Sequence, residues 1–230
     1  EEYEKWGLTI NMNKSEYVIV GGNKTDVILE QEHVTGVDSY KYLGVDIHRD
    51  GSWNTEIQKR IKDVRRVTKQ LNSVLWNKYI RKERKIRIYK TVVESVSTYA
   101  AEVWVAPDRL KKKLLSMEMS FWRRCCNLTL ADRVRNEDIR QQMGIDADIT
   151  DTLEAKNLRW YGHVQRMPPN RWPKKLLRWV PTETRKRGRP RRTWSQEVSR
   201  NMTTRQLTDN DWRDRQKWRL ECDKRPPRCQ

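Results

Sequence analysis

The sequence predicts an α+β fold that is mostly α, with a small antiparallel sheet near the N-terminus followed by helices. Short runs of β-branched and aromatic residues, broken by turn-forming residues, lie between residues 16 and 50. After Gly51 the spacing of apolar residues changes from two to about 3.6, as in amphipathic helices. Hydrophobic residues make up only 36% of the chain, but 11 Trp and 8 Tyr supply large side chains for a core.

The predicted sheet consists of three runs. Residues 16–20 and 27–29 flank Gly21-Gly22-Asn23-Lys24, a sequence that can form a hairpin turn. Residues 40–47 alternate well enough to place their tyrosines in packing positions. We therefore expect the first two runs to pair as a hairpin and the third to complete the sheet.

Three long helices are expected next. The clearest spans about residues 57–75, where apolar residues recur at spacings of three and four and cations occupy the other face. A second runs from about Lys82 to Val103, shortly before Pro107, and its expected buried side includes Tyr89, Val92, Val93 and Tyr99. A third runs from Arg109 to about Cys126. Together they predict a helical bundle.

Shorter helices follow. Asn136 can cap a helix that runs to Met143, where Gly144 supplies a C-terminal stop. Thr150 opens another helix, which Pro168-Pro169 ends.

The last part of the chain contains a linker and a final helix. Residues 181–193 have no periodic apolar face and are typical of a linker. Thr208 and Asp211 resemble a capping box, which predicts a helix over residues 211–222.

Charge is unevenly distributed along the chain. Lys and Arg total 49 against 31 Asp and Glu, a net charge of +18. Residues 153–230 contain 22 basic and 8 acidic residues, a net charge of +14, which leaves +4 for residues 1–152. Such an excess favours polyanionic partners. No apolar run approaches the roughly 18 residues of a membrane-spanning helix, so the sequence argues against a membrane protein.

Processing signals are sparse. The N-terminus has neither the basic nor the apolar region of a secretory signal, and it begins without Met, which predicts that the true start lies upstream. Four Cys do not make a dense disulfide framework for a chain of this length, so reducing conditions are expected.

Several short motifs follow one another in a recognisable order. Residues 7–15 are Gly-Leu-Thr-Ile-Asn-Met-Asn-Lys-Ser, and Tyr42-Leu43-Gly44 lies in the third predicted strand. Residues 85–93, 158–167 and 187–194 continue the series, the last two with His-Val-Gln-Arg-Met and Arg-Gly-Arg-Pro cores. The chain resembles, over nearly its whole length, the reverse transcriptases of non-LTR retrotransposons, in the endonuclease and reverse transcriptase polyprotein group of transposable elements.

The resemblance implies a domain organisation. The expected parts are a distal palm with the primer grip at 1–52, a helical thumb at 53–130, a small helical region at 131–180, a basic linker at 181–194 and a helical tail at 195–230. It also implies nuclear localisation.

The resemblance assigns roles to two motifs. Lys14 corresponds to a lysine that gives a proton to the departing pyrophosphate. Its residue type alone favours a solvated turn lysine, and the motif match makes the two interpretations equal. Ser15 replaces the commoner Thr and keeps the hydroxyl. Tyr42, Leu43 and Gly44 correspond to the primer grip.

The catalytic centre is not expected in this chain. In these enzymes paired aspartates hold two Mg²⁺ ions that stabilise the attacking and leaving oxygens. The sequence contains no Asp-Asp pair, and we expect that pair upstream of Glu1. The fragment alone is predicted to be inactive and without a cofactor, whereas the parent RNA-directed DNA polymerase would need Mg²⁺.

A basic stretch is the second candidate site. Its six cations are Arg185, Lys186, Arg187, Arg189, Arg191 and Arg192. Phosphate contact is the favoured role, and insertion into an A·T-rich minor groove is a narrower one. A basic linker or a nuclear-import signal explains the same composition.

Aromatic residues alternate with cations around this stretch. They are Trp160, Tyr161, Trp172, Trp179 and Trp194. Single-stranded nucleic acid is held by such mixtures, with bases on the rings and cations along the backbone. Helical spacing more often places Trp in a core, so we expect most of these rings to be buried and one or two exposed.

Metal binding is not predicted. Cys125, Cys126, Cys222 and Cys229 lack the Cys-x₂-Cys spacing of the zinc knuckle that some related retroelement proteins carry. His163 is expected to be a packed or hydrogen-bonding residue.

Two functions remain. The first is a reverse transcriptase fragment that positions the primer–template, with RNA, DNA and the upstream polymerase and endonuclease regions of the same polyprotein as partners and no membrane. The second is a non-enzymatic nucleic-acid-binding protein or a decayed relic of such an element. Phosphate contacts carry little base information, so both RNA and DNA are expected partners.

Overall fold

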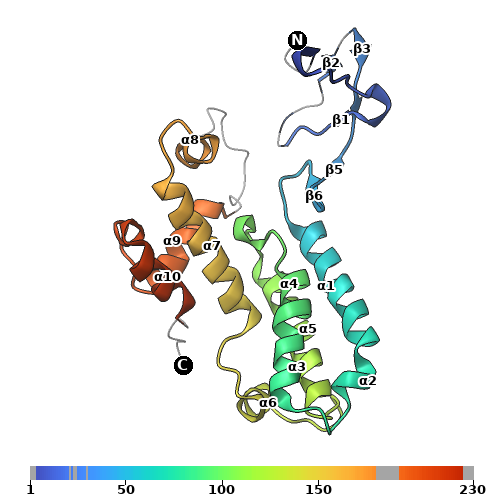
Figure 1. Cartoon of the computed structure of the whole chain (residues 1–230), viewed down its shortest axis with the longest axis vertical. Coiled ribbons are helices and arrows are strands. Elements are labelled where there is room, and N and C mark those ends of the chain that lie inside the picture. Colours follow the sequence, from blue (N-terminus) through green and yellow to red (C-terminus); the bar gives the residue numbers. More distant parts are fainter. Residues whose placement is uncertain (1–3, 21, 23–24, 30, 180–191, 225–230) are drawn as a thin grey trace. The chain divides into compact units, whose positions relative to one another are not determined.

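The structure is a computed structural model that describes residues 4–20, 22, 25–29, 31–179 and 192–224. It confirms the α+β, mostly helical fold (Figure 1). The chain divides into two compact units, residues 1–56 and 57–230, and the boundary falls in the first turn of helix α1 (Asn54–Gln70).

The first unit contains three two-stranded sheets. β1 (Glu16–Tyr17) pairs in parallel with β4 (Thr35–Gly36), β2 (Ile28–Leu29) pairs antiparallel with β3 (Glu32–His33), and β5 (Ser39–Tyr42) pairs antiparallel with β6 (Val45–His48). Two short 3₁₀ helices, Glu4–Trp6 and Met12–Lys14, precede the strands.

The predicted hairpin between residues 16–20 and 27–29 is wrong, because β1 pairs with β4, and the described residues of this unit do not form a single antiparallel sheet. Tyr17 explains the change of partner, because its ring lies against Gly36, where a Cβ would come within 2.7 Å of the hydroxyl. The same hydroxyl donates a hydrogen bond of 2.6 Å to the Thr25 carbonyl. The tyrosine thus packs β1 beside β4 instead of β2.

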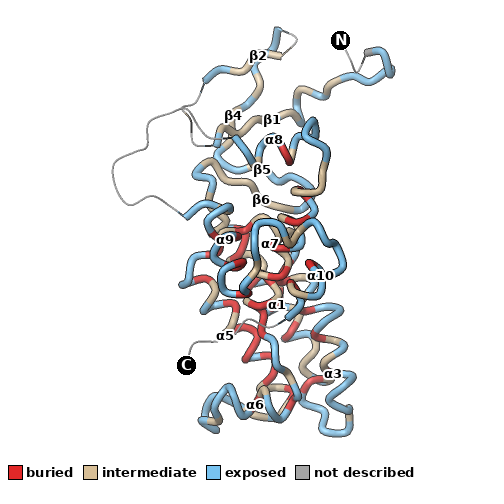
Figure 2. The backbone as a smooth tube through the Cα atoms, turned by 90° about the vertical axis from the view of Figure 1, so that its left-hand side faces the viewer, coloured by how far each residue is buried: buried red, intermediate tan, exposed pale blue. Residues whose placement is uncertain are grey.

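Burial differs sharply between the two units. Among the described residues of the first unit, the one buried side chain is Glu56, whose Oε2 accepts a hydrogen bond from the Asp46 N–H at 3.0 Å. The buried apolar side chains of the described chain lie between Ile57 and Cys222. Figure 2 shows this as buried positions along the helices and intermediate or exposed ones along the strands.

The second unit is helical. Its elements are α1, α2 (Asn72–Leu75), α3 (Lys82–Ile88), a π-helical segment (Tyr89–Glu94), α4 (Ser95–Ser97), α5 (Asp108–Cys125), α6 (Asn136–Met143), α7 (Ile149–Arg166), α8 (Trp172–Arg178), α9 (Trp194–Thr204) and α10 (Arg215–Asp223). Short 3₁₀ helices, Ala101–Val103 and Asp211–Arg213, complete it.

Helix α7 is the centre of this unit. It packs against α5, α9, α10 and the 3₁₀ helix 101–103. One buried cluster joins α7, α9 and α10, and its members are Leu158, Val198, Met202, Trp218 and Cys222. An aromatic cluster joins the π-helical segment to α5, with ring centroids 4.4 Å apart between Tyr89 and Trp122 and 4.9 Å apart between Phe121 and Trp122.

The continuous helix predicted from Lys82 to Val103 is wrong. It changes to π-helical bonding at Tyr89 and ends at Ser97, and Ala100 then adopts a left-handed φ of 57°. The wider π turn moves the buried face onto positions four apart, which are Lys85, Tyr89, Val93 and Ser97. Val92 and Tyr99, expected in the core, are exposed instead.

Helix ends agree with the sequence to within a few residues. Gly144 ends α6 with a left-handed φ of 70°, as predicted. Asn136 does not cap that helix, because its side chain accepts a hydrogen bond from Arg123 at 2.7 Å. Helix α7 is capped by Asp148 in a complete capping box with Asp151, not by Thr150.

The final helix also begins later than predicted. Thr208 donates hydrogen bonds to Asp211, but these lead into a 3₁₀ turn, and Asp214 caps α10. None of the described helices is long and apolar enough to cross a bilayer.

Candidate nucleic-acid interface

Lys14 lies at the end of the 3₁₀ turn Met12–Lys14, and its side chain is exposed. The turn is closed by two bonds to the Asn11 carbonyl, from the Lys14 N–H at 3.0 Å and from the Ser15 hydroxyl at 2.9 Å. Ser15 therefore shapes the turn that presents Lys14.

Tyr42, Leu43 and Gly44 form the tip of the β5–β6 hairpin. Tyr42 pairs with Val45, and the two residues between them, Leu43 and Gly44, have φ values of 47° and 80°. Positive φ at both central positions is the geometry of a type I′ turn. Tyr42 is 57% and Leu43 74% exposed, so the motif presents two large side chains at the tip of the hairpin.

Most of the basic stretch lies outside the described residues, which include only its last member, Arg192. The Arg192 guanidinium donates a hydrogen bond of 2.9 Å to Glu197, and Lys111 of α5 donates another of 2.6 Å to the same carboxylate. Burial alone would raise the pKa of Glu197, but these two cations outweigh it and hold the pKa below its ordinary value. Arg192 thus fixes the end of the basic stretch to α9.

The five aromatic residues near that stretch are more accessible than expected. Trp172 is 73% and Trp179 64% exposed, and Trp160, Tyr161 and Trp194 are half-buried. Two exposed rings match the expectation of one or two, but the other three are half-buried, so the expectation that most of the rings are buried is not met. The Trp194 ring packs against the buried cluster of α7, α9 and α10, and its Nε1 donates a hydrogen bond of 2.9 Å to the Glu102 carbonyl.

His163 is exposed on α7. Its ring lies 5.4 Å from the Trp160 ring, centroid to centroid. Among the described residues, no three His, Cys, Asp or Glu side chains are grouped so that they could hold a metal ion.

A cationic groove along α5 is absent from the sequence-based predictions. It has a volume of about 730 Å³ and is lined by Arg65, Lys112, Arg123 and Arg124, together with apolar side chains that include Trp76. Within the described residues, its lining contains no acidic side chain. These cations come from α1 and from both halves of α5, so they are far apart in the sequence and only the fold brings them together. The groove combines positive charge with a partly exposed indole.

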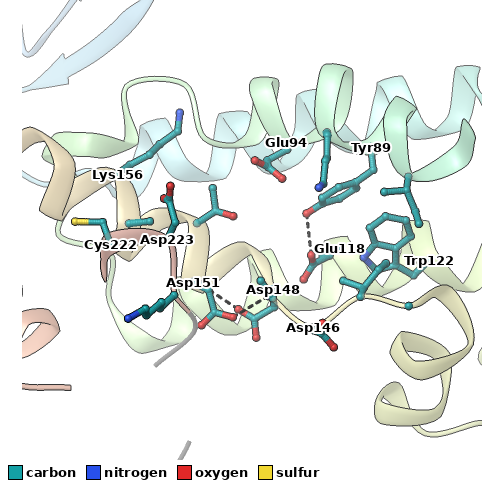
Figure 3. A pocket seen from close by; sticks show the side chains of 18 of the residues that line it. Tyr89, Glu94, Glu118, Trp122, Asp146, Asp148, Asp151, Lys156, Cys222 and Asp223 are labelled. Carbon is teal, nitrogen blue, oxygen red and sulfur yellow. Dashed lines mark hydrogen bonds between the residues drawn. The ribbon is translucent and has the colours of Figure 1, made fainter. Parts of the chain in front are cut away.

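A second cavity, of about 620 Å³, has a different character (Figure 3). Six carboxylates line it, which are Glu94, Glu118, Asp146, Asp148, Asp151 and Asp223. Lys90, Lys156, Arg159, Arg205 and Lys224 lie among them, so its charges nearly balance.

Glu118 accepts three hydrogen bonds at the wall of that cavity. It accepts from the Tyr89 hydroxyl at 2.8 Å, from Arg140 at 3.2 Å and from the Ile149 N–H at 3.3 Å, as Figure 3 shows for the tyrosine. Burial raises the pKa of both Glu118 and Tyr89. Arg140 also bonds Asp148, so one network joins α5, α6 and α7. The carboxylates of Glu118 and Asp148 are already used by the protein itself, which makes the network a structural one.

The chain is similar to an uncharacterised transposon-derived protein of Caenorhabditis elegans. The two are 25% identical over 176 residues, which cover 74% of this chain and 62% of the relative. The chain thus spans less than two thirds of that protein's length. No family model and no solved structure matches the chain. The similarity relates the chain to proteins of transposable-element origin.

Proposed function

We propose that the chain is the C-terminal part of a non-LTR retrotransposon reverse transcriptase, in which it holds the primer–template and binds nucleic acid. The order of the motifs supports this assignment, and the transposon-derived relative agrees with it. The cationic groove along α5 adds a surface suited to a phosphate backbone.

In the proposed enzyme each motif has a separate task. The hairpin tip Tyr42-Leu43-Gly44 contacts the primer strand, and Lys14 lies near the incoming nucleotide. The catalytic aspartates and their Mg²⁺ ions belong to the upstream region, which would supply the two-metal chemistry of nucleotidyl transfer. This chain alone binds but does not polymerise.

The observation that carries the proposal furthest is the composition of the α5 groove. Four cations line it without an acidic residue among the described ones. Arg123 is partly committed to the Val134 carbonyl and the Asn136 side chain, whereas Arg65 and Lys112 are exposed. A duplex lying along the groove would place its phosphates against Arg65, Lys112 and Arg124.

The test is binding of the full chain to a fluorescent RNA–DNA hybrid and to a DNA duplex at several salt concentrations. The triple variant Arg65→Ala, Lys112→Ala, Arg124→Ala should lower the log-log salt slope on duplex DNA by about 2.7, since each phosphate contact contributes about 0.9. A matched variant, Arg81→Ala, Arg84→Ala, Arg87→Ala, removes the same charge from exposed positions outside the groove. Equal slopes for the two variants would contradict the groove assignment.

The alternative is a protein of the same origin that only binds nucleic acid. The charge and the lack of an Asp-Asp pair in this chain favour it equally. The genomic sequence directly upstream separates the two. An open frame that encodes the Asp-Asp motif supports the polymerase, and a stop codon or an unrelated exon contradicts it.

A further inference from the structure

Helix α8 presents an unusual surface. Trp172 and Leu176 lie in α8, and Trp179 is the residue that caps its C-terminal end. Their spacings of four and three place them along one side of the helix. Their exposed fractions are 73%, 62% and 64%. Large apolar side chains in contiguous exposed groups mark interaction sites more often than isolated ones do.

A row of cations runs beside this face with the same spacing. Arg171, Lys175 and Arg178 are all exposed, and the Lys175 Nζ lies 5.1 Å from the centre of the Trp172 ring. The surrounding sequence, residues 155–182, contains seven basic residues and no acidic one. The ligand of this surface must therefore combine negative charge with flat apolar groups.

The opposite side of α8 is anchored to the rest of the helical unit. Lys174 is only 4% exposed, and its Nζ donates a hydrogen bond of 2.6 Å to the Gln165 carbonyl of α7. The same Nζ lies 5.4 Å from the centre of the Trp212 ring. This anchoring fixes which face of α8 points outward, so little conformational freedom is lost when a ligand binds.

We propose that the α8 face, formed by Trp172, Leu176 and Trp179 with Arg171, Lys175 and Arg178, binds unpaired nucleotides of a single-stranded nucleic acid. Bases stack on the two indoles while the cations follow the backbone. The Cα atoms of the two tryptophans are about 10 Å apart along the helix axis, given a rise of 1.5 Å per residue, so the rings engage separate bases. In a duplex the base faces are already stacked, which leaves only the phosphate contacts.

A membrane surface fits these observations less well. Interfacial helices bind in proportion to the apolar area they bury. Helix α8 has seven residues and a single exposed aliphatic side chain, Leu176, between its two rings. The inference rests on the proposed function in one respect, which is that the chain binds nucleic acid.

The test uses the full chain and the double variant Trp172→Leu, Trp179→Leu, which keeps apolar side chains and removes the stacking rings. The control is Trp6→Leu, because Trp6 is 77% exposed and lies far from α8 in the sequence. The probes are fluorescent 15-mers of dT and of rU, and a duplex of the same length. We expect affinity for the single strands to fall at least tenfold in the double variant and to change less than twofold on the duplex and in the control.

The outcomes separate the inference from the function on which it rests. If the wild-type chain binds none of the three probes, both the proposed function and the inference fail. If it binds them but the double variant binds single strands as tightly as the control does, or loses affinity equally for the duplex, only the inference is overturned. Loss of binding to vesicles of phosphatidylserine and phosphatidylcholine, with single-strand affinity unchanged, would also overturn it and assign the face to membranes.

Discussion

Lys85 of α3 is a buried charged residue. It is 2% exposed, and its Nζ donates hydrogen bonds to the carbonyls of Leu75 at 2.7 Å and Cys125 at 2.9 Å. Those carbonyls belong to the last residues of α2 and α5, which the helices themselves leave without N–H donors. One ammonium group thus supplies the hydrogen-bond donors for the terminal carbonyls of two helices.

Replacing Lys85 by Met should therefore destabilise the helical unit by about 3 kcal/mol, because two charge-assisted bonds are lost and two buried carbonyls remain without donors. Urea unfolding followed by circular dichroism measures the change. Lys82→Met, at an exposed position of the same helix, is the control and should shift the midpoint little. Equal midpoints for the two variants would contradict the role given to Lys85.

Glu118 gives the molecule a specific pH dependence. Its pKa is raised by burial, so the folded chain binds that proton more tightly than the unfolded chain does. The resulting stabilisation is complete below the ordinary value of 4.5 and is lost as the pH rises through the raised value. The stability of the wild type relative to Glu118→Gln should thus decrease as the pH rises above about 4.5. Urea midpoints across that range measure it, with the exposed Glu137→Gln as a control that should show no such trend.

At the scale of elements, the contact between α7 and α10 depends on the absence of one side chain. A Cβ at Gly162 would lie 2.3 Å from Nε1 of Trp218, and that nitrogen donates to the Leu158 carbonyl at 3.0 Å. Trp218 is 1% exposed, so its ring has no room to retreat. The packing of Trp218 against α7 thus requires a residue without a side chain at the glycine of the Tyr-Gly-His sequence.

Gly162→Ala separates this packing from helix propensity, because the two effects have opposite signs. Propensity alone would stabilise α7 by about 1 kcal/mol. Overpacking against Trp218 should instead destabilise the unit by about 1–3 kcal/mol. Thermal unfolding followed by near-ultraviolet circular dichroism reports both the stability and the indole environment, and a higher melting temperature would refute the packing explanation.

Much of the element pattern could be predicted from the sequence, and the departures have local causes. Apolar periodicity located α1 and α5 because their buried faces follow the regular 3.6-residue repeat. The π-helical turn at Tyr89 breaks that repeat, which is why the burial of Val92 was predicted wrongly. Strand pairing failed because β1 and β4 are joined by the Tyr17 ring, a contact that propensity does not encode.

The candidate sites were predictable to a different degree. The motifs at Lys14 and Tyr42 are contiguous in sequence and could be found by inspection. The α5 groove gathers cations from residues 65 to 124, which only the packing of α1 and α5 brings together. The α8 face was predicted in composition only, since helical spacing does not reveal which of five aromatic residues stay exposed.

For the whole molecule, charge predicts how binding responds to salt. The net charge of +18 is concentrated in residues 153–230, which carry +14. If about six phosphates are contacted, the log-log salt slope on duplex DNA should be near −5, and deleting residues 185–192 should flatten it. Anisotropy titrations at several salt concentrations measure both slopes. If the deletion leaves the salt slope unchanged, the phosphate contacts lie elsewhere on the chain, for example in the α5 groove.

The unequal burial of the two units has a calorimetric consequence. The heat capacity increment of unfolding arises mainly from apolar surface that becomes hydrated, about 12–15 cal/mol/K per residue in an ordinary domain. In the described chain every buried apolar side chain lies at or after Ile57. The first 56 residues therefore add length with little heat capacity, and the increment of the isolated chain, divided over 230 residues, should fall below the ordinary range.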